Sequence, residues 1–216
     1  MSHRSSFSHV TFRDMMHRAR KEAILQECEH LLGEVGYEAM TLEQVAESAG
    51  VAKAVLYKHF KGKEELCCEV MVRGIDRARD YLVGLSPSLS AYQRLCAFVR
   101  WMLQAQIDGD GPFIPERKSH IRQVLRENEA YVLARASLED LLDGYLDEAQ
   151  RMGAIHAGWR LEVARWLLLT RAVDPLLDNL QSQLDFTAQE AVDWCTKSTM
   201  AALQAEPVSL PQGMAA

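Results

Sequence analysis

Apolar residues recur at intervals of three and four along most of the chain, and runs that alternate apolar and polar residues are missing. Spacing of three and four places apolar side chains on one face of an α-helix, whereas alternation would place them on one face of a strand. The pattern therefore predicts an all-α protein.

The first third of the chain is predicted to contain one longer helix followed by two short ones. The longer helix covers residues 14–35 and stops before a glycine. Thr41 and Gln44 then show the spacing of a capping box, which marks the start of the first short helix. The second short helix covers residues 52–60 and follows Gly50, which permits a tight bend. Two short helices joined by a tight turn are typical of a helix-turn-helix.

Beyond this region the predicted helices become longer. Their expected ranges are residues 63–83, 88–107, 115–126, 129–152, 159–184 and 187–205. Pro175 is expected to kink its helix or to leave the carbonyl of residue 173 or 174 without a partner. No glycine- or serine-rich linker separates the short helices from the long ones, so we expect the two parts to be mechanically coupled.

The composition favours a globular protein of the bacterial cytoplasm. A chain of 216 residues with 48% hydrophobic residues can bury a substantial core. No apolar run is long enough to span a membrane, and the start of the sequence lacks the apolar stretch of a signal peptide. The 5 cysteines form no C-x-x-C pair, which favours reduced and buried thiols.

The net charge of −6 excludes a generally basic surface, so any contact with DNA has to come from a local patch. Such a patch is present in Lys53, Lys58, Lys61 and Lys63. On a helical wheel, Leu56 shares a packed face with its apolar neighbours, and Lys58 lies on the opposite side. The alternative interpretation of these lysines is an ordinary solvated surface.

The outward face of the second short helix suits the major groove of DNA. Ala54 allows a close approach of the backbone, Val55 can contact a thymine methyl group and Lys58 can donate to guanine acceptors. Lys53 and Tyr57 lie nearer the edges of this face and suit phosphate oxygens. The coincidence of this face with a helix-turn-helix pattern favours DNA binding over a chance cluster of charge.

Residues 36–66 resemble the N-terminal pattern of the TetR family of bacterial transcriptional regulators; they read GYEAMTLEQVAESAGVAKAVLYKHFKGKEEL. The resemblance implies a homodimer that binds a palindromic operator, usually a repressor released when a small, largely apolar molecule enters the C-terminal domain. Ala52 stands where the family usually has Ser or Thr, and Ala54 and Val55 stand where Gly and Thr are common. The operator sequence therefore does not carry over from relatives.

With the resemblance, the sequence predicts a helix-turn-helix domain with its N-terminal arm over residues 1–62 and a ligand-binding and dimerisation domain over 63–206. Residues 207–216 are expected to be a disordered tail. Arg4 and Arg13 in the arm either reach a minor groove or belong to a disordered basic end. The expected DNA-contacting residues are Thr41, Lys53, Ala54, Val55, Tyr57, Lys58, Lys61 and Lys63.

The C-terminal helices offer candidates for a ligand cavity and for a dimer interface. The expected cavity residues are Tyr92, Cys96, Met102, Phe113, Val124, Tyr131, Trp166 and Thr170. Each of them is also a candidate for plain core. The expected interface residues are Leu168, Leu177, Leu180, Ala191, Cys195, Thr199 and Ala202. The alternative is that the last helices only close the core of one chain.

An enzyme and a pure protein-interaction module are the rival classes of function. The sequence contains a single Glu-x-x-His, Glu27 with His30, and neither a phosphate-binding loop nor a G-x-S-x-G motif. We therefore expect no catalytic residue, no metal ligand and no cofactor. An interaction module would show no salt-dependent DNA binding, and this property separates it from a regulator.

Overall fold

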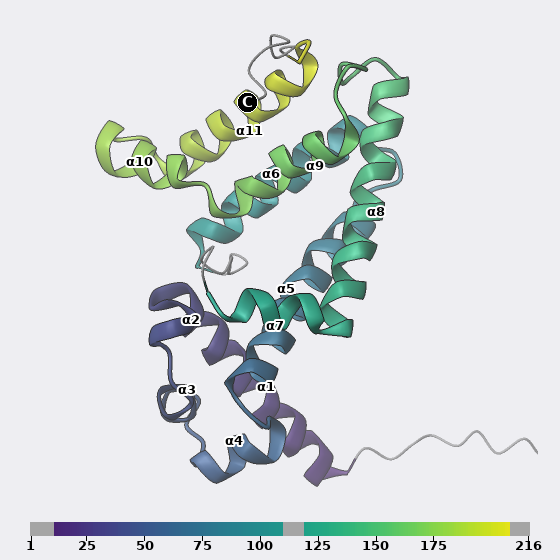
Figure 1. The fold of residues 1–216 in the computed structure, drawn as a ribbon. Coiled ribbons are helices and arrows are strands. Elements are labelled where there is room, and N and C mark those ends of the chain that lie inside the picture. The colour runs from purple at the N-terminus through teal and green to yellow at the C-terminus, as the bar shows by residue number, and fades with distance from the viewer. Residues whose placement is uncertain (1–10, 110–118, 208–216) are drawn as a thin grey trace, which may run out of the picture. The chain divides into compact units, whose positions relative to one another are not determined.

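The computed structural model describes residues 11–109 and 119–207, and within these ranges every regular element is a helix (Figure 1). The prediction of an all-α fold is thereby confirmed. Phe113, Arg4 and the predicted tail beyond Pro207 lie outside the described residues. The elements are α1 Phe12–Glu34, α2 Gly36–Ala39, α3 Leu42–Ser48, α4 Lys53–His59, α5 Lys63–Gly84, α6 Ala91–Ile107, α7 Ile121–Glu127, α8 Glu129–Arg151, α9 Leu161–Leu169, the 3₁₀ helix η1 Thr170–Val173, α10 Pro175–Leu184 and α11 Ala188–Gln204.

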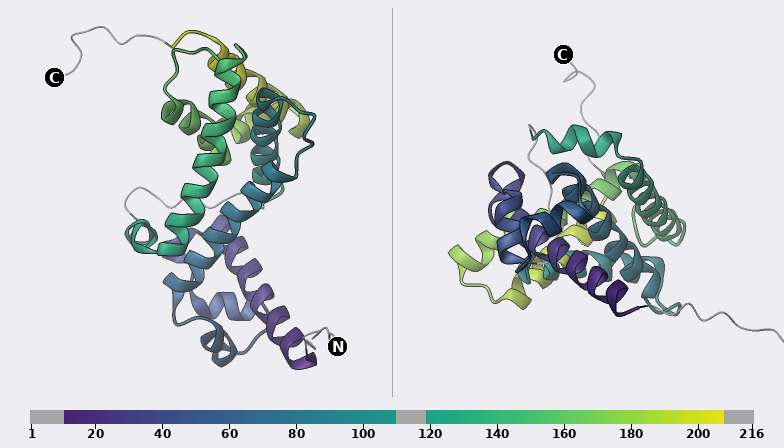
Figure 2. Two further views of the ribbon diagram at one scale, coloured as in Figure 1. Left: turned by 90° about the vertical axis from the view of Figure 1, so that its right-hand side faces the viewer. Right: turned by 90° about the horizontal axis from the view of Figure 1, so that it is seen from below.

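The chain forms two compact units, and the division between Val70 and Met71 falls within α5. In the first unit α1, α3 and α4 pack on one another. The side chains of Ile24 and Leu56 are fully buried there. The long helix of this unit is α1, shown in purple in Figures 1 and 2. A hydrophobic core of this kind holds the short α3 and α4 in place, because isolated helices of 7 residues are not stable in water.

The short helix α2 was not predicted from the sequence. It has only 4 residues, and it begins at Gly36, whose φ of +76° favours glycine. Its backbone closes through a bond from Met40 N to Gly36 O at 3.2 Å. Tyr37 is buried at 7% exposure, so tertiary packing, rather than local periodicity, holds this turn.

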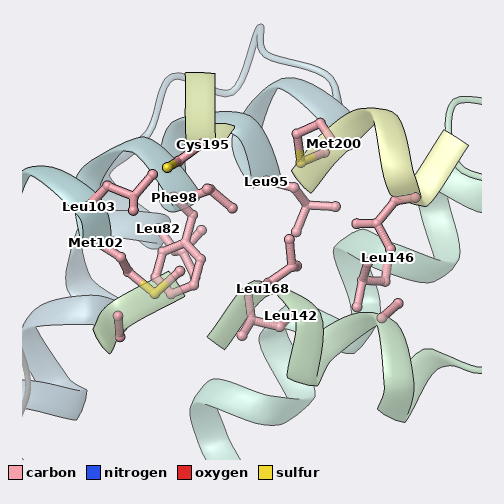
Figure 3. Packing of buried hydrophobic residues seen from close by; sticks show 14 of the residues in the cluster. Leu82, Leu95, Phe98, Met102, Leu103, Leu142, Leu146, Leu168, Cys195 and Met200 are labelled. Carbon is pink, nitrogen blue, oxygen red and sulfur yellow. The ribbon is translucent and has the colours of Figure 1, made fainter. Parts of the chain in front are cut away.

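The second unit has its own core, formed by α6, α8, α9 and α11 with the end of α5 (Figure 3). Phe98 of α6, Leu142 of α8 and Leu168 of α9 are all fully buried. Their side chains point toward one another in Figure 3. This core explains why the later helices are apolar on more than one face: each packs against neighbours on several sides.

The helix predicted over residues 159–184 is interrupted at Pro175, as the proline indicated, but the interruption is a full break into α9, η1 and α10 and not a kink in one helix. Pro175 cannot continue a helix and pushes Asp174 into an extended conformation, with φ −86° and ψ 106°. Pro175 then starts α10, and the Asp174 side chain accepts from Leu176 N at 3.1 Å. Gln106 of α6 bonds to both Asp174 N and Asp174 O, at 2.9 and 3.1 Å. Both backbone groups of Asp174 are therefore hydrogen-bonded at the break, and its carbonyl is not left without a partner.

None of the described helices combines the length and the apolar character needed to cross a bilayer.

Candidate nucleic-acid interface

A tight turn built around Gly50 joins α3 to α4. Gly50 has φ +63°, a conformation in which a side chain is strained. Gly50 N donates to Glu47 O at 3.0 Å, and Val51 N donates to Ala46 O at 2.9 Å. These paired bonds form a Schellman motif, which ends α3 and satisfies its last carbonyl groups. The turn sets the direction in which α4 leaves α3.

The start of α3 carries the capping box that the sequence indicated. Thr41 Oγ1 accepts from Gln44 N at 3.2 Å, and Gln44 Oε1 accepts from Thr41 N at 2.8 Å. Each side chain satisfies an amide that the helix itself leaves free. By contrast, Ala52 at the start of α4 provides no side-chain cap. A free amide at this end of α4 is available to an outside acceptor such as a phosphate oxygen.

The two sides of α4 differ in burial. Leu56 and Phe60 are buried at 0% and 1% exposure in the first unit. Ala54, Tyr57 and Lys58 are exposed, with Tyr57 at 48%. The helix thus presents one small residue flanked by a phenol and an ammonium group, as the helical wheel indicated. A surface of this shape admits close approach to the base edges of a major groove.

The predicted DNA-contacting residues do not all have the same exposure. Thr41 and Lys61 are exposed, together with Lys53 and the outward residues of α4. Val55 and Lys63 are half-buried. The exposed members of the set therefore lie on α4, directly before α3 and shortly after α4.

Lys53 has a partner that the sequence reasoning missed. Its ammonium forms an ion pair with Glu43 of α3 and lies 5.9 Å from the centre of the Tyr57 ring. The hydrogen bond with Lys53 lowers the pKa of the Glu43 carboxyl, and the same bond raises the pKa of the Lys53 ammonium. A phosphate that binds Lys53 must compete with Glu43. The sequence does not indicate this ion pair, because the turn at Gly50 brings together two residues that are ten positions apart.

Lys63 is oriented by α2 and not by α4. Its ammonium lies 4.2 Å from the centre of the Tyr37 ring and donates to Glu38 O at 3.4 Å. Lys61 differs, because its side chain is exposed while its backbone amide donates to the Glu65 carboxylate. Of these two lysines, Lys61 has the freer side chain for a phosphate contact.

Two histidine rings lie close together at the end of α4, with their planes inclined by 46°. The rings of His59 and His17 lie 4.2 Å apart between centroids, and His59 Nδ1 is buried without a hydrogen-bond partner among the described residues. Burial, followed by the charges of His17, Lys21 and Arg20, lowers the pKa of His59, while Glu69 opposes this effect. The neutral form of His59 is therefore the one that suits the folded state.

We expect stability to fall as the pH drops from about 7.5 to 5.5. A histidine with a lowered pKa binds fewer protons in the folded state than in the unfolded chain, so stability is lost below the unfolded pKa of about 6.5. His59→Gln is expected to reduce this loss, measured by urea denaturation at each pH. The matched control is His30→Gln, on the exposed part of α1. An equal loss in wild type and His59→Gln would contradict the assignment.

The predicted ligand-cavity residues are dispersed over the second unit. Tyr92 and Cys96 of α6 line a groove of about 550 Å³ against α11. Met102 is buried in the core at 2% exposure, whereas Trp166 is exposed at 52% and Thr170 is also exposed. Val124 and Tyr131 are half-buried, and Phe113 lies outside the described residues. The groove also contains residues of α11 that the sequence reasoning did not name.

The predicted interface residues lie mostly inside their own unit. Ala202 is exposed, but the other members are buried at 8% exposure or less: Leu168, Leu177, Leu180, Ala191, Cys195 and Thr199. The physical reason is that α11 packs on α6 and α10, and α9 packs on α8. The structure thus buries these side chains in the second unit of a single chain, and Ala202 is the exposed member of the predicted set.

Comparison with known proteins relates the first unit to DNA-binding proteins. Residues 24–70 match the family described as bacterial regulatory proteins, tetR family. An HTH-type transcriptional regulator of Staphylococcus aureus is 29% identical over 86 residues, which are 39% of this chain and 46% of that protein. The match therefore spans less than half the length of this curated relative.

Solved structures share the fold over most of the chain. The regulator FadR from Bacillus subtilis, in complex with stearoyl-CoA, has a TM-score of 0.62 at 18% identity, covering 87% of this chain and 99% of that chain. AibR, in complex with isovaleryl coenzyme A and operator DNA, has a TM-score of 0.57 at 19% identity, covering 83% and 97%. At such identities the likeness shows the fold alone.

Proposed function

Since its N-terminal unit places the chain in the TetR family of bacterial transcriptional regulators, we propose that it binds operator DNA through α4 and that a small molecule controls this binding. The observation that carries the proposal is the exposed face of α4, with Ala54 beside Tyr57 and Lys58. Ala54 permits close approach, Lys58 reaches base edges, and Tyr57 reaches phosphate. Such a protein acts in the cytoplasm, where the bacterial chromosome lies, and we assign it no enzymatic reaction.

The proposed binding form is a homodimer on a palindromic operator. Two copies of α4 must then lie about 34 Å apart to enter successive major grooves. The exposed apolar side chains on the C-terminal helices support an interface there: Trp166 and Trp194 are exposed at 52% and 49%. We propose these two tryptophans for the interface in place of the buried residues expected from the sequence, because an interface needs apolar surface that the chain does not already cover.

The proposed regulation is release of the operator by a small, largely apolar ligand bound in the second unit. A ligand with different affinities for two arrangements of the dimer shifts the population toward the one it prefers, and operator DNA must weaken ligand binding by the same factor. The complexes of FadR with stearoyl-CoA and of AibR with isovaleryl coenzyme A add a second class of effector to test, acyl esters of the large and anionic coenzyme A.

Fluorescence anisotropy on DNA selected from a randomised pool tests the proposed function. Wild type is expected to bind selected DNA with an affinity that falls steeply with salt. Tyr57→Phe keeps the ring and removes the hydroxyl, so it isolates the phosphate contact. We expect it to weaken binding about tenfold, as for a hydrogen bond to a charged group. If the pool yields no preferred sequence and binding is weak at all salt concentrations, the protein is not a DNA-binding regulator.

A further inference from the structure

A groove between α6 and α11 has the dimensions of a small-molecule site. Its volume is about 550 Å³, within the range of roughly 300 to 1,000 Å³ that ligand pockets occupy. Tyr92 and Cys96 line it from α6, and Thr196, Lys197 and Met200 line it from α11. All of these residues belong to the second unit, whereas the DNA-contacting face of α4 belongs to the first.

The hydroxyl group of Thr196 is the unusual feature of this groove. Thr196 is buried at 6% exposure, and its Oγ1 has no hydrogen-bond partner among the described residues. A helical threonine ordinarily bonds to a carbonyl of the preceding turn. Thr199 on the same helix does so, with its Oγ1 donating to Cys195 O at 2.7 Å. A buried hydroxyl without a partner is costly, and a ligand oxygen in the groove would supply the missing bond.

The charges around the groove favour an anion. Lys197 lines it and is exposed, and its charge adds to the hydrogen bonds of Arg100 and Gln189 in lowering the pKa of Asp193. Arg100 also lines it, but its guanidinium pairs with Asp193, which additionally accepts from Gln189 at 2.7 Å. Arg100 and Asp193 therefore offset each other, and the ammonium of Lys197 leaves a net positive charge beside the Thr196 hydroxyl. This arrangement suits a carboxylate and disfavours an ammonium group.

Apart from the side chain of Gln204, the remaining walls of the groove are largely apolar. Met200 presents a flexible thioether from α11, and Tyr92 presents an aromatic ring from α6. Burial of its thiol raises the pKa of Cys96, so this residue stays neutral and adds no negative charge to the groove. Side chains of this kind pack against an alkyl chain or an aromatic ring.

We propose that the groove between α6 and α11 binds a small carboxylate with an apolar body. The carboxylate accepts a hydrogen bond from Thr196 Oγ1 and interacts with the ammonium of Lys197, and the apolar body packs on Met200 and Tyr92. This inference rests on the proposed function, because it names the class of ligand bound in the second unit, and it is tested without DNA so that the two proposals can fail separately.

The experiment titrates the full chain with octanoate, using calorimetry together with methyl NMR of ¹³C-methyl-methionine protein. Octanoate is expected to bind and to shift the Met200 resonance, assigned with Met200→Leu, more than that of Met102, which is equally buried but does not line the groove. The neutral 1-octanol and the cationic octylammonium are expected to bind more weakly. Thr196→Val should weaken octanoate binding on the order of tenfold, because it removes a hydrogen bond to a charged group. Thr199→Val is the matched control and should leave the affinity unchanged.

Thermal unfolding of the two threonine variants tests whether weaker octanoate binding is caused by a loss of folding stability. Thr196→Val replaces an unpartnered buried hydroxyl by a methyl group of the same shape, so we expect its Tm to stay equal to that of wild type or to rise. The proposal is overturned if octanoate does not bind, if 1-octanol or octylammonium binds as tightly, or if Thr196→Val and Thr199→Val have equal affinities. Anisotropy on operator DNA is measured separately, so loss of DNA binding would refute the proposed function and leave the groove intact.

Discussion

Lys58→Ala is expected to weaken binding to operator DNA by about 1–3 kcal/mol for each copy of α4 that contacts it. Lys58 lies at the centre of the outward face of α4, is exposed, and forms no ion pair with another described residue. Its ammonium is therefore available to a guanine or a phosphate without first leaving a protein partner. Lys53, which is paired with Glu43, should contribute less for this reason.

Anisotropy across a salt series measures this effect. If Lys58 neutralises a phosphate, the slope of log K against log salt should become less steep by about one for each copy of α4. Arg151→Ala is the control for total charge, because Arg151 is an exposed cation on α8 of the second unit, where it pairs with Asp147. Equal losses in the two variants would show that total charge, rather than the position of Lys58 on α4, governs binding.

Leu168→Ala is expected to lower the free energy of unfolding by about 2–5 kcal/mol, the cost of a cavity in a packed core. Leu168 is fully buried among the side chains that α6, α8 and α11 contribute to the second unit. Its neighbours include Leu142, which faces it in Figure 3. These contacts lie within one chain, so the loss should appear at every protein concentration. Urea denaturation followed by circular dichroism measures it.

Leu133→Ala is the matched control for this substitution. Leu133 lies on α8 at 63% exposure, and its loss is expected to change the free energy of unfolding by no more than about 0.5 kcal/mol. Light scattering on the same samples reports the oligomeric state. If Leu168→Ala kept the stability of wild type but dissociated a dimer, Leu168 would belong to an interface between chains and not to the core.

The local pattern of the sequence sufficed for most helices and for the turn between α3 and α4. Thr41 and Gln44 form the capping box that their spacing indicated, and Gly50 adopts the positive φ that the bend requires. Over residues 159–184 the apolar pattern continues across Pro175, and the proline alone indicated an interruption. Periodicity reports which face is apolar, but it does not report that Gln106, 68 positions away, bonds to the backbone of Asp174.

The candidate sites divide in the same way. The outward face of α4 follows from the helical wheel alone, because Leu56 and Phe60 identify its buried side. A helical wheel does not show whether an apolar face packs against its own chain or against a second chain. Leu168 and Cys195 were therefore candidates both for the core of one chain and for a dimer interface. Their burial in one chain became visible only with the packing of all helices in the second unit.

The sequence by itself determined the all-α fold, the helix-turn-helix and the identity of its exposed face, because each depends on residues within a few turns of one another. Only the tertiary structure decided the pairing of Lys53 with Glu43, the bonds between Gln106 and the backbone of Asp174, and the groove that Thr196 lines together with α6. These features depend on contacts between residues far apart in the chain. Such contacts arise from the packing of whole helices, and local spacing carries no record of them.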